Sequence, residues 1–268
     1  MTGIPYCDEV WNVTAGCTKC APGCKNCWAE KWAARLAHIG QRKYQDVVDG
    51  NYNNWFLPKW NNKVYCDESI LEQPLHWKKP RRIFVCSMSD LFHPRVPFEY
   101  MAEIFLIAQK CSTHTFLFFT KRIKRALEFY EWDYPLKLAN SWGQLKNIQL
   151  ILSLSTQKEA DEKIPTLLQI PAAVRGLSIE PMLEPLNIIR WLDYGGYEED
   201  WGIRWVIVGC ESGSNRRPCK IDWVRSIVQQ CKAANVPVYV KQLSINGKVS
   251  RNPKEWPEDL RVQQYPKK

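Results

Sequence analysis

The chain has 268 residues, of which 45% are hydrophobic and 24% charged, a balance typical of an ordinary globular protein. This composition excludes a disordered or collagen-like chain, and no apolar run reaches the roughly 18 residues of a membrane span. The N-terminal stretch lacks the basic start and apolar core of a secretory signal. We therefore expect a cytoplasmic protein with no membrane partner. The net charge of +9 favours an anionic partner such as nucleic acid or a nucleotide.

The first predicted elements are a short strand over 9–14 and a helix over 28–38, with a cysteine-rich loop between them. The loop carries Cys17, Cys20, Cys24 and Cys27. An odd total of 11 cysteines in a cytoplasmic chain argues against a disulfide framework. Thiolates this close can converge on one metal or cluster, because Gly16, Pro22 and Gly23 allow sharp turns.

The number of thiolates in that loop leaves two kinds of site open. Three ligands would leave one iron of a 4Fe–4S cluster available for another ligand, whereas four would suit a closed zinc or cluster site. A zinc ribbon usually has a longer span between its two cysteine pairs. The spacing in this loop is cramped for a zinc ribbon, and it leaves a zinc site and an iron–sulfur cluster both open.

A polar, Asn-rich stretch follows at about 39–80 and carries Trp55, Trp60 and Trp77. We interpret it as an inserted subdomain within a single domain of residues 1–268, which ends in a C-terminal tail at about 244–268. The tryptophans could stack a substrate ring, but we expect them to fill a small core.

Short apolar runs then alternate with amphipathic stretches along the rest of the chain. The predicted strands cover 83–88, 115–119, 148–154, 174–179, 205–208 and 237–240, and the predicted helices cover 98–110, 121–130, 158–168 and 222–234. This alternation predicts βαβ units and a parallel sheet. About seven strands suit a complete or partial (β/α) barrel of the TIM type, with a doubly wound open sheet as the alternative.

Polar side chains follow most of the predicted strands. They are Ser87 and Asp90, Lys121 and Arg122, Ser153, Glu180, Glu211, and Lys241. In a parallel barrel all these strand ends share one rim with the cysteine loop, and that rim holds the active site. Each side chain taken singly also fits a structural role, such as a turn cap or a surface ion pair.

The cysteine loop resembles known cluster-binding sequences. Cys20-x3-Cys24-x2-Cys27 matches the signature of radical S-adenosylmethionine (SAM) enzymes. The wider segment WNVTAGC…PGCKNCWAE is similar to a phage- and mobile-element-associated family of unknown function that has a three-cysteine motif. The similarity extends in order from residue 6 to about 243, through SMSDLFHPRVP (87–97), FFTKR (118–122), LSIEPML (177–183), VIVGCESG (206–213) and VKQL (240–243).

The resemblance implies that Cys17, Cys24 and Cys27 bind a 4Fe–4S cluster and that S-adenosylmethionine is the second cofactor. The family's motif favours Cys17 as the first ligand, and the generic radical-SAM spacing makes Cys20 the alternative. This chain departs from the family at Cys20, at Cys210 and in the segment 153–157.

The rim side chains take roles from their order along the rim. Ser87 and Asp90 are candidates for holding the SAM ammonium, and Lys121 or Arg122 for holding its carboxylate. We also include Ser153 among the cofactor-binding candidates. Glu180, Glu211 and Lys241 are the candidate catalytic residues.

We expect a radical-SAM-like enzyme that cleaves SAM and acts on an unknown substrate, which could be a nucleic acid or a nucleotide. A protein encoded by a linked gene is a further candidate partner. The main alternative is a non-enzymatic, metal- or cluster-stabilised protein that binds nucleic acid. A hydrolytic site with Glu180 and Glu211 as acid and base ranks last.

Overall fold

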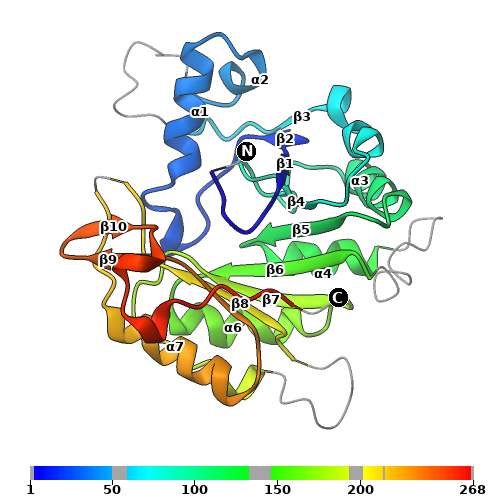
Figure 1. Ribbon diagram of the computed structural model, residues 1–268. Coiled ribbons are helices and arrows are strands. Elements are labelled where there is room, and N and C mark those ends of the chain that lie inside the picture. Colours follow the sequence, from blue (N-terminus) through cyan, green and yellow to red (C-terminus); the bar gives the residue numbers. More distant parts are fainter. Residues whose placement is uncertain (1–2, 50–58, 133–145, 193–201, 214, 267–268) are drawn as a thin grey trace. The chain divides into compact units, whose positions relative to one another are not determined.

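The structure is a computed structural model that describes residues 3–49, 59–132, 146–192, 202–213 and 215–266 (Figure 1). Within these ranges the fold is mixed α/β with an eight-stranded, mostly parallel sheet, which confirms the predicted α/β class. The strands are β1 (Glu9–Trp11), β2 (Thr14–Ala15), β3 (Tyr65–Cys66), β4 (Arg82–Val85), β5 (Thr115–Thr120), β6 (Ile148–Leu154), β7 (Val174–Ile179), β8 (Trp205–Gly209), β9 (Val238–Ile245) and β10 (Lys248–Ser250). The α-helices are α1 (Trp28–His38), α2 (Arg42–Gln45), α3 (Phe98–Lys110), α4 (Ile123–Glu131), α6 (Gln157–Leu167) and α7 (Ile221–Ala233).

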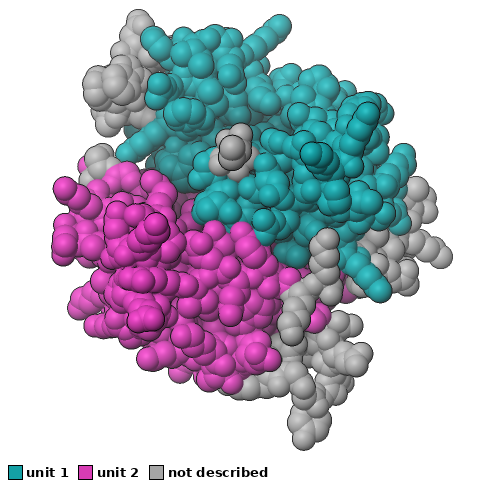
Figure 2. Space-filling view, viewed as in Figure 1, with its two compact units in different colours: residues 1–20, 27–149 teal, residues 21–26, 150–268 magenta. Residues whose placement is uncertain are grey.

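The chain divides into two compact units, which Figure 2 shows in different colours. The first unit contains residues 1–20 and 27–149, and the second contains residues 21–26 and 150–268. The cysteine-rich loop contributes to both units, because residues 21–26 belong to the second.

In the first unit, β4 pairs in parallel with β1 and with β5. Ile83 and Val85 of β4 are almost fully buried, as expected for a strand covered on both faces. Helix α3 packs against β5 through Phe105, whose ring stacks on Phe118 with 4.5 Å between the ring centroids. This packing fixes the carboxyl ends of β1 and β4, from which the chain continues into the cysteine loop and the segment 87–90.

The predicted insertion lies in the first unit and packs beside helix α1. Ala33 of α1 shares one buried apolar cluster with Val47 and Trp60 of the insertion. The prediction that these tryptophans fill a small core is therefore confirmed for Trp60. Trp77 is half-buried, and Trp55 lies outside the described residues.

In the second unit, β8 pairs in parallel with β7 and β9, and β10 pairs antiparallel with β9. Strand β6 contains the boundary between the units, with its residues from Leu150 onward in the second. The predicted C-terminal tail begins inside β9 and contains β10. It is fastened to the sheet, since the amide of Val240 donates to the carbonyl oxygen of Val262 at 2.9 Å.

Four of the predicted elements agree with the structure residue for residue. The predicted helices over 28–38 and 98–110 and the predicted strands over 148–154 and 174–179 have the observed bounds of α1, α3, β6 and β7. The predicted strand over 9–14 ends at Trp11, because Thr14 and Ala15 instead pair antiparallel with the insertion strand β3. Within the described ranges, no helix is long and apolar enough to cross a membrane.

Candidate metal centre

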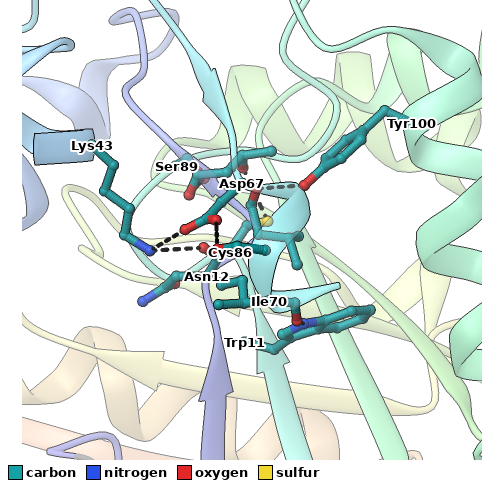
Figure 3. Close-up of polar contacts among 11 residues, drawn as sticks. Trp11, Asn12, Lys43, Asp67, Ile70, Cys86, Ser89 and Tyr100 are labelled. Atoms are coloured by element: carbon teal, nitrogen blue, oxygen red, sulfur yellow. Dashed lines mark hydrogen bonds and ion pairs between the residues drawn. The ribbon is translucent and has the colours of Figure 1, made fainter. Parts of the chain in front are cut away.

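The segment that leads into the cysteine loop is held by polar contacts on both sides (Figure 3). The carbonyl oxygen of Val13 accepts hydrogen bonds from the hydroxyl of Tyr100 and from the amide of Asp67, both at 2.8 Å. The ammonium of Lys43 donates to the Asp67 carboxylate at 3.0 Å and to the carbonyl oxygen of Asn12 at 3.5 Å. Helix α3 and the insertion therefore both fix the backbone before Cys17.

A second set of contacts holds Thr14 against the end of β4. The Thr14 hydroxyl lies 3.1 Å from the Cys86 sulfur, and the Ser89 hydroxyl donates to the Thr14 carbonyl oxygen at 2.9 Å. Cys86 has a φ of 61°, a left-handed conformation that residues other than glycine rarely adopt. Such strain persists only where the surroundings determine the conformation, so this end of β4 is rigid.

Gly16 makes the sharp turn that was predicted directly before Cys17. Its φ is +90°, and a Cβ at this position would lie 2.4 Å from the carbonyl oxygen of Lys63. Only glycine can therefore occupy the position without moving the insertion.

Thr18, the residue after Cys17, is held by two side chains of the first unit. The guanidinium of Arg122 donates to the Thr18 carbonyl oxygen at 2.8 Å and to its hydroxyl at 2.6 Å. Nε2 of His93 lies 2.9 Å from the same hydroxyl. Nδ1 of His93 accepts from the amide of Arg95, which leaves Nε2 as the protonated donor in the neutral ring. Burial and the charges of Arg122 and Arg95 lower the pKa of His93 to about 4.

Asp90 contacts the two residues that precede Arg122 and the backbone of His93. Its carboxylate accepts from the Thr120 hydroxyl at 2.8 and 3.0 Å and from the amide of Lys121 at 3.1 Å. Its carbonyl oxygen accepts from the amide of His93 at 3.0 Å. Burial raises the pKa of Asp90, although the hydrogen bonds and the charge of Arg122 oppose the rise. The structure thus brings together the predicted residues Asp90, Lys121 and Arg122.

The other arm of the loop is held within the second unit. Pro22–Cys24 forms a 3₁₀ turn, and the carbonyl oxygen of Pro22 accepts from the Arg217 guanidinium at 3.0 Å. Arg217 also binds the carboxylate of Glu211 through its amide at 2.7 Å, Nε at 3.0 Å and a terminal nitrogen at 2.5 Å. The side-chain amide of Asn26 donates to the same carboxylate at 3.0 Å.

Glu211 is only 5% exposed, and its hydrogen-bonding partners decide its ionisation. Burial alone would raise the pKa of Glu211, but the hydrogen bonds from Arg217 and Asn26 outweigh burial and lower it. The carboxylate is therefore charged, and its oxygens are occupied by Arg217 and by Asn26, which lies on the arm that carries Cys24.

The loop cysteines are more exposed than most of the other cysteines. Cys17, Cys24 and Cys27 are half-buried and Cys20 is exposed, and both Cys17 and Cys27 pack against the apolar cluster beside α1. Elsewhere, burial raises the thiol pKa of Cys111, raises it to about 11 in Cys66, Cys86 and Cys210, and raises it to about 12 in Cys219 and Cys231. Burial therefore disfavours the thiolate, the form of cysteine that binds metal, at these positions.

The donor set of the loop fits an iron–sulfur cluster by its chemistry, because three thiols on one short loop are the ligands that such clusters take. In the described ranges, no group of three or more Cys, His, Asp or Glu side chains is arranged to hold a metal ion.

Two of the candidate catalytic residues form a second polar group in the second unit. The ammonium of Lys241 binds Oε2 of Glu180 at 2.5 Å, so the structure brings these two residues together. The other oxygen of Glu180, Oε1, is buried and has no hydrogen-bond partner among the described residues. Of the other candidates, Ser87 donates to the side chain of Asn12 at 3.1 Å, and Ser153 is buried at the end of β6.

Residues 1–264 match the family described as a protein of unknown function, DUF5131. The chain belongs to this family. No curated protein and no solved structure matches the chain.

Four residues that hold the loop of this DUF5131 chain were not among the sequence candidates. They are Thr18, His93, Asn26 and Arg217. His93 lies in the segment SMSDLFHPRVP, and Arg217 follows VIVGCESG after a few residues, so both were close to recognised motifs. Nothing in the sequence pattern indicates that Arg217, rather than Lys241, is the partner of Glu211.

Proposed function

We propose that the chain is a radical-SAM-like enzyme that binds a 4Fe–4S cluster through Cys17, Cys24 and Cys27. One observation carries the proposal. The three thiols lie on one short loop whose two arms are each fastened by an arginine, one arm at Thr18 and the other at Pro22. Cys17, Cys24 and Cys27 would hold the cluster, which when bound and reduced would supply the electron for SAM cleavage, and the protein would supply binding and orientation.

We propose Cys17 rather than Cys20 as the first ligand. Cys17 and Cys27 pack against the same apolar cluster, and the residue after Cys17 is held by Arg122 and His93. Cys20 is the exposed cysteine of the loop. A ligand held on a rigid segment loses less conformational entropy on binding, which favours Cys17.

For S-adenosylmethionine we propose Arg122 as the group that holds the carboxylate. Its Nε is buried and has no hydrogen-bond partner among the described residues, so it can still donate to an anionic oxygen. Asp90, whose carboxylate oxygens are both occupied, would act by positioning Arg122 and His93. Ser87, Lys121 and Ser153 remain proposed cofactor contacts.

The Glu180–Lys241 pair is the proposed substrate-binding and catalytic group. A buried acceptor without a donor costs free energy, so Oε1 of Glu180 is a natural acceptor for a hydroxyl or amino group of a ligand. Glu180→Gln keeps the volume and should reduce turnover more than the melting temperature. Normal turnover together with a large loss of stability would assign Glu180 a structural role instead.

Glu211 takes a different proposed role. Its carboxylate is occupied by Arg217 and Asn26, so we propose that it positions the arm with Cys24 instead of contacting the substrate. We also propose that the parallel sheet is part of a complete or partial barrel. The cytoplasm as compartment, the association with phages and mobile elements, a linked partner protein, and a nucleic-acid or nucleotide substrate belong to the same proposal.

The test is anaerobic reconstitution of the full chain with iron and sulfide, followed by a SAM-cleavage assay under reducing conditions. We expect a brown protein with about four irons per chain and formation of 5′-deoxyadenosine. A colourless protein that binds zinc and leaves SAM intact would overturn the proposal in favour of a metal-stabilised, non-enzymatic protein.

A further inference from the structure

Helix α1 carries a stripe of exposed side chains that the proposed site does not use. Trp28, Trp32, Arg35 and Ile39 follow one another at intervals of four, three and four residues, which places them on one side of the helix. Trp28 is 46% exposed, Trp32 is 44% exposed, and Ile39, the residue that ends the helix, is 63% exposed. The opposite side of the helix, with Ala33, packs into the apolar cluster of the first unit.

This exposed α1 face, defined by Trp28, Trp32, Arg35 and Ile39, is also cationic. The Arg35 guanidinium lies 5.2 Å from the ring centroid of Trp32, and the exposed Lys31 precedes Trp32 in the chain. Among the described residues, neither Arg35 nor Lys31 has a carboxylate within ion-pair distance.

The acidic residue of α1 does not offset this charge at the surface. Glu30 is buried, accepts from the amide of Trp60 at 3.1 Å and pairs with Lys19 at 2.8 Å. The exposed side of the helix therefore combines aromatic rings with positive charge that no carboxylate in the described part of the chain neutralises.

We propose that the exposed α1 face binds single-stranded nucleic acid. Unpaired bases stack on exposed aromatic rings, and arginine and lysine beside those rings bind the phosphates. A duplex offers no free base faces to Trp28 and Trp32. A lipid surface would require a wider apolar stripe than two tryptophans and one isoleucine with an arginine between them.

The exposed α1 face is adjacent to the cysteine loop in the sequence. Trp28 directly follows Cys27, so a strand bound along α1 would begin at the last cysteine of the loop. The inference rests on the proposed function in one respect, namely that the bound strand is the substrate.

The test is fluorescence anisotropy of a short, labelled, mixed-sequence single-stranded oligonucleotide with the full chain, in DNA and RNA forms and without reconstituted cluster. We expect binding that weakens steeply with salt. Trp32→Ala should weaken it about fivefold or more, and Trp32→Tyr should retain most of it. Arg35→Glu should also weaken it strongly. The matched control is Lys232→Glu, an equal charge change at an exposed position of α7.

Strong losses in Trp32→Ala and Arg35→Glu with near-normal binding in Lys232→Glu support the proposal. Equal losses in Arg35→Glu and Lys232→Glu would overturn it, because binding would then follow net charge alone. Absence of oligonucleotide binding at low salt, or association only with anionic vesicles that Trp32→Ala abolishes, would also overturn it. Trp32, Arg35 and Lys232 are not among the proposed ligands of the cluster or of SAM. Iron content and SAM cleavage therefore test the proposed function separately from this inference.

Discussion

Arg122 and Arg217 each donate from a guanidinium to a carbonyl oxygen of the cysteine loop, the first at Thr18 and the second at Pro22. Their electrostatic settings differ. Arg217 is neutralised by the buried Glu211, which it binds at 2.5 Å, whereas Arg122 has no carboxylate within ion-pair distance among the described residues.

We interpret the contact of Arg217 with the loop as structural, whereas Arg122 can still bind a ligand. The charge of Arg217 is already compensated, so this residue serves to hold the arm that contains Cys24. Arg122 keeps a net positive charge and a buried Nε without a partner among the described residues. It can therefore hold the Cys17 arm and bind an anionic ligand at the same time.

The largest expected effect concerns the thiols on these two arms. Cys24→Ala and Cys27→Ala should each lose most of the iron after reconstitution, because the remaining thiolates cannot complete the site. Cys231→Ala should keep the wild-type iron content, since burial raises the pKa of that thiol to about 12. Iron measured per folded chain decides the matter, and wild-type iron in both loop variants would end the assignment.

The first ligand can be determined in the same assay. We expect Cys17→Ala to lose the cluster and Cys20→Ala to keep it, because Cys17 is packed against the apolar cluster and Cys20 is exposed. The reverse result would show that the generic radical-SAM spacing decides the ligand. Loss of iron in both variants would indicate a closed site with four thiolates.

The next prediction concerns Arg217, whose charge is neutralised by Glu211. Arg217→Ala would leave the carboxylate of Glu211 buried and unpaired, which should lower the free energy of unfolding by about 3–5 kcal/mol. Urea unfolding of the apo chain measures the change. Lys158→Ala, which breaks a mostly exposed ion pair with Glu162, is the control and should change stability by less than about 0.5 kcal/mol. An equally small change in Arg217→Ala would remove the structural role of the pair.

Substitution of Arg122 should have a different effect from substitution of Arg217. Arg122→Lys keeps the charge, but its ammonium does not reach as far as the terminal nitrogen that makes both contacts to Thr18, and it has no equivalent of Nε, so we expect a loss of about 1–2 kcal/mol of stability. Its affinity for SAM should fall more than stability does, whereas in Arg217→Ala stability should fall more than the SAM affinity of the remaining folded protein. SAM binding by the reconstituted chains, measured beside urea unfolding, tests this contrast. The same ratio of effects in both variants would mean that the two arginines are equivalent.

The sequence predicts much of the fold because the residue patterns of the strands and helices are local. The runs that became α1, α3, β6 and β7 were predicted with their observed bounds. The break after Trp11 was missed, since it depends on pairing between Thr14–Ala15 and a strand fifty residues away in sequence. Local pattern cannot reveal such a partner.

The candidate site shows the same division. Asp90, Lys121 and Arg122 were predicted together, because each follows a predicted strand and parallel strands end at one edge. Glu211 was also predicted at a strand end, but its partner Arg217 was not, since a carboxylate near several cations can pair with any of them. The choice is made by the loop after β8, whose turn brings the Arg217 amide and guanidinium to one carboxylate.

The last expected effect is the pH dependence contributed by His93 beside Arg122. In the unfolded chain His93 has an ordinary pKa of about 6.5, whereas in the folded chain burial and the charges of Arg122 and Arg95 lower its pKa to about 4. Between these values the unfolded chain binds the additional proton, so the free energy of unfolding should fall as the pH falls from about 6.5 toward 4. We expect His93 to account for about 2 kcal/mol of the loss between about pH 7 and pH 5.

Urea unfolding of wild type and His93→Gln at both pH values measures this loss, and the variant should lose less stability than wild type. Asp90 contributes in the opposite direction, because burial raises its pKa, but it is present in both chains and cancels in the comparison. Equal losses in the two chains would show that His93 is not held neutral against Thr18.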